Sequence, residues 1–495
     1  MLNDILAISP LTIIAIAAGL ILLLTVAGGE KRPAPIQSTH LNLIAILALG
    51  WSGYLLWNHS TDAAVFNERV LIDGVFSAFG LISILGALLA ILVAIAYLQE
   101  HKLAAGEFIG LILLSTFGML VVIGAGDLLN LFIGIETMSL AIYVLAGYLR
   151  NSKLSQEAAM KYFLYGAFAS AFALFGIALL YGECGRLTGT ASIKYSQLSP
   201  AFKTGELGLL GWIGISMVLG GFGFKVAAVP FHMWAPDVYE GAPTPATAFM
   251  AAGVKAASFA ALIRFVDSVI LSQGQPSESL VQAFELLAIM TMVVGNFVAI
   301  RQTQIKRMLA YSSVAHAGYV FVGLSAWLAR PGHEALSGVA YYLCGYTFMT
   351  VGAFAVIIAL EHRDKDKDNL SIDDLSGHGI AHPFLGLCMG IFMFGLAGIP
   401  PSVGFFGKLA MFGAAVDAGR IPLVIIAVLA SAVGAYYYLR VIVVMFMQPL
   451  NKEAKIVHSP WLQSGLFTCA FLTLFIGTLP ESYFSMLRSL LKSWL

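Results

Sequence analysis

Four ionisable side chains lie inside long apolar stretches of this 495-residue chain, where a charge is costly. Lys225 stands in GGFGFKVAAVPFHMWAPD, Lys255 in TPATAFMAAGVKAASF, Lys408 in FGLAGIPPSVGFFGKLAMFG and Glu136 in DLLNLFIGIETMSLAIYVLAGY. An ionisable group in mid-membrane costs at least about 2.5–3.5 kcal/mol on insertion scales, so such groups usually face a partner or water. One such residue alone could be a snorkelling or paired packing residue, but four in separate segments favour a functional set.

These residue types suit proton transfer. Burial lowers the pKa of an ammonium group, and a nearby carboxylate raises it again. A buried lysine beside a movable glutamate can therefore load and release a proton near neutral pH. His316, in KRMLAYSSVAHAGY, is a candidate relay for protons. A hydrogen-bonded packing histidine is an equally good interpretation of His316.

Other chemistries lack their motifs. The sequence has no C-x-x-C pair, no His/Asp/Glu cluster with metal-ligand spacing and no glycine-rich nucleotide motif. The 27 basic and 27 acidic residues balance, so nothing indicates a nucleic-acid partner. We therefore expect no metal and no cofactor in this chain.

The elements that hold these residues are expected to be transmembrane helices. Hydrophobic residues make up 59% of the chain and charged residues 11%, against about 25% charged in soluble domains. A spanning helix needs about 20 mostly apolar residues. Fourteen segments qualify, and the first is expected to be a retained helix rather than a signal peptide: 10–28, 41–57, 73–98, 107–125, 127–149, 157–181, 207–234, 242–267, 280–300, 305–328, 336–361, 382–413, 421–447 and 460–480.

Two of the lysines lie beside helix breakers. Gly220, Gly221 and Gly223 precede Lys225 and Pro230 follows it. In the twelfth segment, Pro400 and Pro401 precede Lys408 in the same way. Proline removes a helix hydrogen bond, so helices 7 and 12 should be broken within the membrane. Irregular backbone at that depth is tolerated where it is buried in protein or lines a watery cavity.

The two broken helices also predict an internal repeat. Each is the fourth helix of a five-helix block, at residues 107–267 and 280–447. Because each block has an odd number of helices, the second would enter the membrane from the opposite side, as in many transporters. The remaining parts are three N-terminal helices (1–106) and a C-terminal helix with its tail (448–495). The fold class is thus an all-α polytopic membrane protein with two inverted repeats.

Lysine and arginine positions predict the orientation. With the N-terminus outside, the inside loops and adjoining helix ends hold fifteen basic residues and the outside nine, Arg264 among the latter. The positive-inside rule then places both termini on the periplasmic side or its equivalent. Asp237 and Glu240, in WAPDVYEGAP, are expected in an inside turn that caps the next helix.

Four runs make a family resemblance recognisable. They are LLNLFIGIETMSLAIYVLAGY, FKVAAVPFHMWAPDVYEGAPTPATAFMAAGVKAASF, KRMLAYSSVAHAGYVFVG and GLAGIPPSVGFFGKLAMF. They closely resemble the antiporter-like subunit N family of bacterial NADH–quinone oxidoreductase, respiratory complex I, which is related to mitochondrial subunit 2. The resemblance spans about residues 100–450.

The resemblance implies a role in proton pumping. The family's functional glutamate of the fifth helix falls on Glu136, and its lysines of the seventh, eighth and twelfth helices fall on Lys225, Lys255 and Lys408. The related subunit M usually has glutamate at the last position. FMN, iron–sulfur clusters and the NADH and quinone sites would lie in other subunits. The implied partners are other membrane subunits of complex I and the lipid bilayer, in the bacterial cytoplasmic (inner) membrane.

Three alternatives remain open at this stage. The chain could be a large subunit of a stand-alone multisubunit sodium/proton antiporter, which shares the glutamate and lysine pattern. It could serve a complex I relative fed by ferredoxin. It could also be a membrane scaffold whose charges merely pair. Co-purification of flavin, iron–sulfur and quinone-reducing subunits would separate these.

Overall fold

The computed structural model describes residues 2–27, 35–58, 62–204, 206–271, 278–361, 370–450 and 456–492. Its elements in chain order are α1 (Leu2–Ala7), α2 (Ser9–Ala27), α3 (Pro35–Trp57), β1 (Ala63–Val65), β2 (Val70–Ile72), α4 (Gly74–Glu100), α5 (Ala105–Ile123), α6 (Leu128–Ala146), α7 (Lys153–Thr188), α8 (Tyr195–Thr204), α9 (Leu209–Lys225), α10 (Trp234–Gly241), α11 (Thr244–Phe249), the π turn η1 (Met250–Val254), α12 (Lys255–Phe265), the π turn η2 (Val266–Ile270), α13 (Glu278–Ile300), α14 (Ile305–Ala329), α15 (His333–Leu360), the 3-10 turn η4 (Asp373–Leu375), α16 (His378–Ala381), α17 (Pro383–Ala397), α18 (Val403–Asp417), α19 (Ile421–Met447), α20 (Pro460–Thr478) and α21 (Pro480–Leu491).

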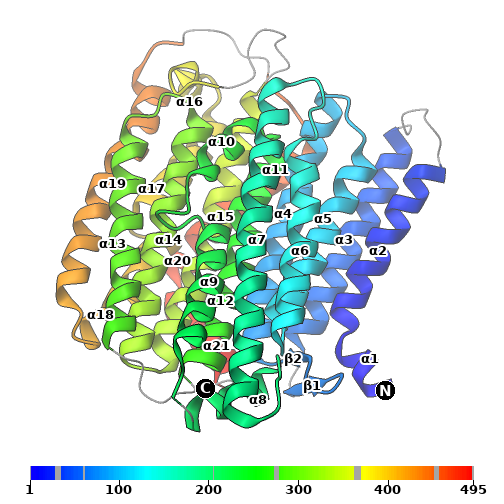
Figure 1. Cartoon of the computed structure of the whole chain (residues 1–495). Coiled ribbons are helices and arrows are strands. Elements are labelled where there is room, and N and C mark those ends of the chain that lie inside the picture. Colours follow the sequence, from blue (N-terminus) through cyan, green and yellow to red (C-terminus); the bar gives the residue numbers. More distant parts are fainter. Residues whose placement is uncertain are drawn as a thin grey trace.

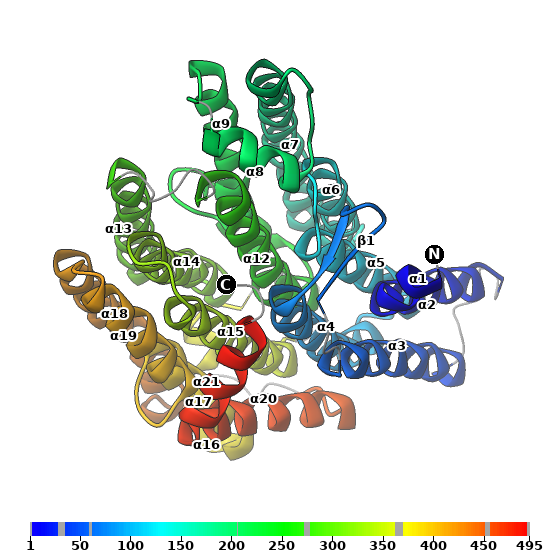
Figure 2. The same ribbon diagram turned by 90° about the horizontal axis from the view of Figure 1, so that it is seen from below.

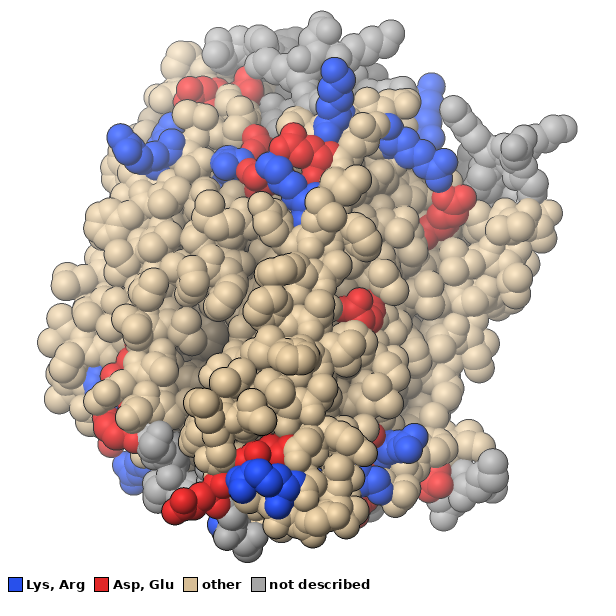
Figure 3. All heavy atoms as spheres, in the orientation of Figure 1, with Lys and Arg blue, Asp and Glu red and all other residues tan. Residues whose placement is uncertain are grey.

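The molecule is a bundle of roughly parallel helices (Figure 1). Among the described residues, 12 helices are long and apolar enough to cross a membrane, or 13 if the sharply bent pair α16–α17 is one span. Figure 3 shows charged side chains gathered toward two ends of the visible face, with a broad, almost uncharged band between them. Many large apolar side chains are exposed on the outside of the bundle, such as those of Ile16, Leu23 and Phe168. The chain is therefore a multi-pass membrane protein, as its composition predicts.

Each of the fourteen predicted segments has a counterpart in the bundle. Twelve are single spans, counting Thr244–Ile270 as one helix that contains two π turns. The other two are divided: segment 207–234 is α9 followed by a non-helical stretch, and segment 382–413 is α17 and α18. The predicted breaks in helices 7 and 12 are thus present. A short antiparallel hairpin of β1 and β2 is an addition that the sequence did not indicate.

The break between α17 and α18 has a clear local cause. Gly398 adopts a left-handed conformation (φ +86°), and its N–H and that of Ile399 close the last turn of α17. Pro400 and Pro401 follow and cannot continue the helix. Ser402 then caps α18 by accepting a hydrogen bond from the Phe405 N–H. The result is two half-helices of 15 residues each.

The other irregularities also adjoin lysines. Lys225 is the last residue of α9, and α10 begins only at Trp234. The π turn η1 ends at Val254, directly before Lys255. The sequence did not predict this π turn, because no proline or glycine pair marks it. All three lysines therefore lie within a few residues of an interruption in regular helix.

The centre of the bundle is made of almost completely buried helices. The span Thr244–Ile270 is wholly buried, and α14 and α15 are nearly so. Viewed along the helices, α4, α12, α14 and α15 lie toward the middle, while α2, α3, α7, α9, α13 and α19 lie around them (Figure 2). Both termini lie at one end of the bundle, beside β1 and β2 (Figure 1).

We predict that the end bearing both termini faces the periplasm. A C-terminal reporter that is active only in the cytoplasm should stay silent, because the opposite end is richer in basic residues. The same reporter placed within residues 362–369 supplies the control and should be active. A strong cytoplasmic signal from the C-terminus would reverse the orientation.

Candidate functional site

Lys225 at the end of α9 faces a polar stripe on α6. Its Nζ donates to Ser139 Oγ at 2.7 Å and to Tyr143 Oη at 3.4 Å. Glu136 lies one turn before Ser139 on the same helix and accepts a hydrogen bond from the Ser170 hydroxyl on α7. Among the ion pairs of the described residues, none joins Glu136 directly to Lys225. The carboxylate is half-buried, whereas Lys225 is only 6% exposed.

Lys255 opens α12 directly after the π turn. Its Nζ donates to both the carbonyl oxygen and Oγ of Ser313 on α14, each at 2.5 Å. The same nitrogen lies 5.5 Å from the centre of the Tyr346 ring on α15, and Lys255 is 3% exposed. These contacts offset part of the desolvation of an ammonium group inside the bundle.

Lys408 uses the break between α17 and α18. Its Nζ donates to the carbonyl oxygens of Leu396 and Ala397, at 3.1 and 3.0 Å, and to Ser431 Oγ on α19 at 2.9 Å. The two carbonyls end α17, where they have no intrahelical donor and carry the negative end of the helix dipole. The ring of Tyr319 lies 4.8 Å from Nζ. The broken helix therefore supplies a ready-made cation site.

A stripe on α14 connects the surroundings of Lys255 and Lys408. Ser313, His316 and Tyr319 are spaced three residues apart, so they lie along one side of the helix. Ser313 contacts Lys255 and Tyr319 contacts Lys408, as described above. His316 between them hydrogen-bonds Tyr438 through Nε2 at 2.8 Å and Tyr342 through Nδ1. The structure thus brings His316 together with two of the predicted lysines.

Uncharged polar side chains extend this set, and the sequence analysis missed them. Tyr437 on α19 donates to Asn296 Oδ1 on α13 at 3.0 Å, and Asn296 Nδ2 donates to Tyr319 Oη at 3.0 Å. Tyrosine and asparagine carry no charge, so they stand out less than lysine or glutamate in an apolar stretch. The three-residue spacing of Ser313, His316 and Tyr319 was the one available clue.

The inside turn predicted around Asp237 and Glu240 is wrong. Both residues lie within α10, and the N-cap residue of α11 is Pro243, so no side chain caps that helix. Asp237 instead pairs with Lys161 at 2.6 Å and Arg307 at 2.7 Å, and Glu240 pairs with Arg307 at 2.8 Å. The carboxylates thus fasten the half-helix after the Lys225 break to α7 and α14.

Arg264 is a further buried charge that the sequence analysis assigned to an outside helix end. It is 1% exposed and donates to both carboxylate oxygens of Asp73, at 2.7 and 2.8 Å. Its Nε donates to the Ile123 carbonyl at 2.7 Å. Each of its three nitrogens donates to an acceptor, so Arg264 fastens α12 to the start of α4 and to the end of α5. In the sequence, Arg264 lies near the end of the apolar segment 242–267, where a charged residue is typical of a loop.

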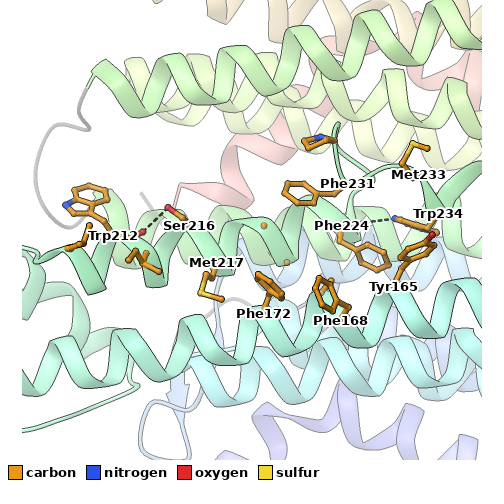
Figure 4. A pocket seen from close by; sticks show the side chains of 16 residues that line it. Tyr165, Phe168, Phe172, Trp212, Ser216, Met217, Phe224, Phe231, Met233 and Trp234 are labelled. Atoms are coloured by element: carbon orange, nitrogen blue, oxygen red, sulfur yellow. Dashed lines mark hydrogen bonds between the residues drawn. The ribbon is translucent and has the colours of Figure 1, made fainter.

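An apolar groove lies between α7 and α9, close to the Lys225 break (Figure 4). It encloses about 750 Å³ and is lined mainly by aromatic, methionine and aliphatic side chains, with Phe231 and Trp234 near the break. Lys225 does not line it; this lysine borders a smaller, neighbouring space that Ser170 and residues of α6 also line. The groove is therefore separate from the ionisable residues.

Within the described residues, no group of three or more His, Cys, Asp or Glu side chains could hold a metal ion. What the arrangement offers is a series of ionisable nitrogens joined to hydroxyl, amide and imidazole groups. Such groups hold and pass protons.

Comparisons with known proteins agree with this chemistry. Residues 125–434 match the family model described as NADH:quinone oxidoreductase/Mrp antiporter, transmembrane. A protein of Trichlorobacter lovleyi named NADH-quinone oxidoreductase subunit N is 46% identical over 415 residues, covering 83% of this chain and 82% of its own. The protein of the same name from Myxococcus xanthus is 41% identical over 484 residues, covering 93% and 92%.

Two solved structures have the same fold. A chain of respiratory complex I from Thermus thermophilus superposes with a TM-score of 0.78 at 32% identity, covering 96% of this chain and 98% of its own. A chain of the Mrp complex from Dietzia sp. gives a TM-score of 0.81 at 20% identity, covering 99% and 97%. At that identity the second likeness concerns the fold alone.

We predict that Arg264→Met destabilises the chain. It leaves the Asp73 carboxylate buried without its partner, a loss of about 3–5 kcal/mol for broken buried pairs. The temperature of half-unfolding in mild detergent should fall clearly. The double variant Arg264→Met with Asp73→Ser should recover much of the loss, since serine keeps the cap of α4 without a charge. Equal melting of the single variant and the wild type would contradict a stabilising role for the pair.

Proposed function

The chain belongs to the NADH:quinone oxidoreductase/Mrp antiporter family of membrane subunits, and we propose that it is the antiporter-like subunit N of an NADH–quinone oxidoreductase. In this role it translocates protons across the membrane while other subunits pass electrons from NADH to quinone. The observation that carries the proposal is the set of three buried lysines, each hydrogen-bonded inside the bundle beside an interrupted helix.

Glu136 and Lys225 form the proposed loading pair. Ser139 lies between them, bound to Lys225, and Glu136 is held by Ser170 on another helix. A shift of α6 against α9 would bring the carboxylate nearer to the ammonium group or move it away. Approach strengthens proton binding by the lysine and withdrawal weakens it, at about 1.4 kcal/mol for each tenfold change. The pair thus takes up and releases a proton in alternate states.

Lys255, His316 and Lys408 form the proposed transfer route. Proton transfer needs hydrogen-bond reach or a bridging water. Lys255 is hydrogen-bonded to α14, the helix that also carries His316. The tyrosines that surround His316 are followed by Asn296 and Tyr319, and the ring of Tyr319 lies beside Lys408. Because Asn296 is an amide and does not readily exchange its protons, we propose that water carries the proton past it. Protonated lysines along the route also repel one another, so a change of charge at one lysine alters the proton affinity of the next.

The proposals on repeats, cofactors, partners and location follow from membership of the same family. We propose that residues 107–267 and 280–447 are inverted repeats, since each contains a divided helix next to a lysine. FMN, iron–sulfur clusters and the NADH and quinone sites are assigned to other subunits, and further membrane subunits of the complex are the partners. The location proposed is the bacterial cytoplasmic membrane, with both termini on the periplasmic side.

A second candidate is a large subunit of a multisubunit sodium/proton antiporter, which the fold of the Mrp complex chain favours. The subunit N relatives at 41–46% identity support the first proposal more strongly. Purification in mild detergent separates the two, and also a ferredoxin-fed relative. Flavin, iron–sulfur and NADH-oxidising subunits should accompany the chain. Their absence from an intact preparation would overturn the first proposal.

We predict that Glu136→Gln and Lys225→Ala each reduce proton pumping and coupled quinone reduction by at least about tenfold, because a positioned proton donor or acceptor contributes about 10²–10⁴-fold. The complex should still assemble. The measurement is the rate of proton pumping and the rate of quinone reduction in proteoliposomes, with the exposed Lys153→Ala as control. Wild-type rates in both variants would leave the pair with a structural role only.

We also predict that Lys408→Arg impairs turnover although it preserves charge. Arginine is effectively always protonated, so release of the proton is blocked. Lys408→Glu should impair turnover less, because a carboxyl group remains titratable. Wild-type pumping by Lys408→Arg would show that Lys408 acts by its charge alone.

A further inference from the structure

Each of the three buried lysines is within hydrogen-bond distance of a serine hydroxyl on another helix. Lys225 reaches Ser139 Oγ on α6 at 2.7 Å. Lys255 reaches Ser313 Oγ on α14 at 2.5 Å, and Lys408 reaches Ser431 Oγ on α19 at 2.9 Å. The pairing therefore recurs at three places that are distant in sequence.

Serine differs from the other partners of these lysines. An ammonium group has three hydrogens and can only donate, whereas a neutral amine has two hydrogens and one lone pair that accepts. A carbonyl oxygen can serve only as an acceptor. A hydroxyl can accept from the ammonium group and, after rotation, donate to the amine.

Two of the serines also have a second place for their own proton. Ser139 Oγ donates to the Ile135 carbonyl at 2.5 Å, and Ser431 Oγ lies 3.4 Å from the Ala397 carbonyl, to which it donates. Both of these hydroxyls therefore have an acceptor when the neighbouring lysine is charged.

We propose that Ser139, Ser313 and Ser431 are positioning residues whose hydroxyl groups rotate with the charge of the neighbouring lysine and so allow it to exist both protonated and neutral inside the membrane. The inference rests on the proposed function, which requires both states of each lysine. It identifies the serine hydroxyl as the group that lets each lysine change its protonation state without leaving a buried polar atom unpaired.

The site of Lys408 shows the exchange most fully. The three hydrogens of the ammonium group match three acceptors: the carbonyls of Leu396 and Ala397 and Ser431 Oγ. After the proton leaves, the amine keeps two hydrogens for the two carbonyls. The Ser431 hydroxyl then turns from the Ala397 carbonyl and donates to the lone pair of Nζ. Every polar group has a partner in both states.

Other titratable groups near these lysines must be kept constant in any test. Around Lys408 they are His316 and Tyr319 on α14, Tyr342 on α15, and Tyr437 and Tyr438 on α19; around Lys225 they are Glu136 and Tyr143 on α6 and Tyr162 on α7; around Lys255 they are Tyr239 on α10, His316 on α14 and Tyr346 on α15. Substitution of serine leaves all of them in place. A change in pH dependence would then come from the hydroxyl.

The test is the pH profile of proton-coupled quinone reduction by the assembled complex in membrane vesicles. Ser431→Ala removes an acceptor from the charged form, and a hydrogen bond from a charged donor is the stronger kind. Lys408 should then lose its proton more readily. We expect the alkaline limb of the profile to move to lower pH by roughly 0.5–1 unit, with a reduced maximum.

Two variants serve as controls. Ser431→Thr keeps the hydroxyl and should keep the position of the alkaline limb. Ser258→Ala removes a buried hydroxyl that donates to Val254 on its own helix, and it should leave the profile unchanged. If Ser431→Ala does not assemble, Ser139→Ala tests the same idea at Lys225 with the same expected shift.

A profile of Ser431→Ala, or of its substitute, that superposes on the wild type overturns the inference. Comparison with Lys408→Arg separates this result from a failure of the proposed function. If Lys408→Arg blocks pumping while loss of the serine shifts nothing, only the role of the serines is wrong. If Lys408→Arg pumps normally, the proton route itself is wrong.

Discussion

The removal of three lysine side chains from water is the constraint on which the rest of this structure depends. An ammonium group in an apolar medium is stable only when its hydrogens find acceptors and its charge finds compensation. A regular transmembrane helix offers neither, since its carbonyl groups are already paired. Regular helix is interrupted beside Lys225, Lys255 and Lys408, the side chains that need such acceptors. At Lys408 the interruption supplies the acceptors directly, because the broken helix leaves two carbonyl groups without an intrahelical donor.

The surrounding helices have complementary tasks. The buried span α14 carries Ser313, His316 and Tyr319 at three-residue spacing and so brings the surroundings of Lys255 and Lys408 into one line. Ion pairs outside that line fasten the irregular parts: Arg307 holds the half-helix α10, and Arg264 holds the end of α12. These attachments hold α10 and the end of α12, so the changes of proton affinity that we propose are left to movement of α6 and to hydroxyl rotation at the lysines.

Much of this was predictable because charge and helix breakers are conspicuous in an apolar sequence. The fourteen segments, the two broken helices and the positions of Glu136 and the three lysines inside them all follow from such signals. The π turn before Lys255 was not predictable, since it results from packing rather than from a breaker residue. Serine, tyrosine and asparagine partners were missed because uncharged polar residues stand out less than charged ones in an apolar sequence. Arg264 was misplaced because its burial depends on Asp73, which lies 191 positions away.

The most direct test of the account is the proton-to-electron ratio of the intact complex in proteoliposomes when Lys255 is replaced by methionine. Lys255 is the most buried of the three proposed proton-carrying lysines, at 3% exposure, so its loss removes the middle station without altering either membrane face. The account predicts a clearly lower ratio than in the wild type and in a Lys153→Met control, in a complex that still assembles and still oxidises NADH. A wild-type ratio in Lys255→Met would contradict it.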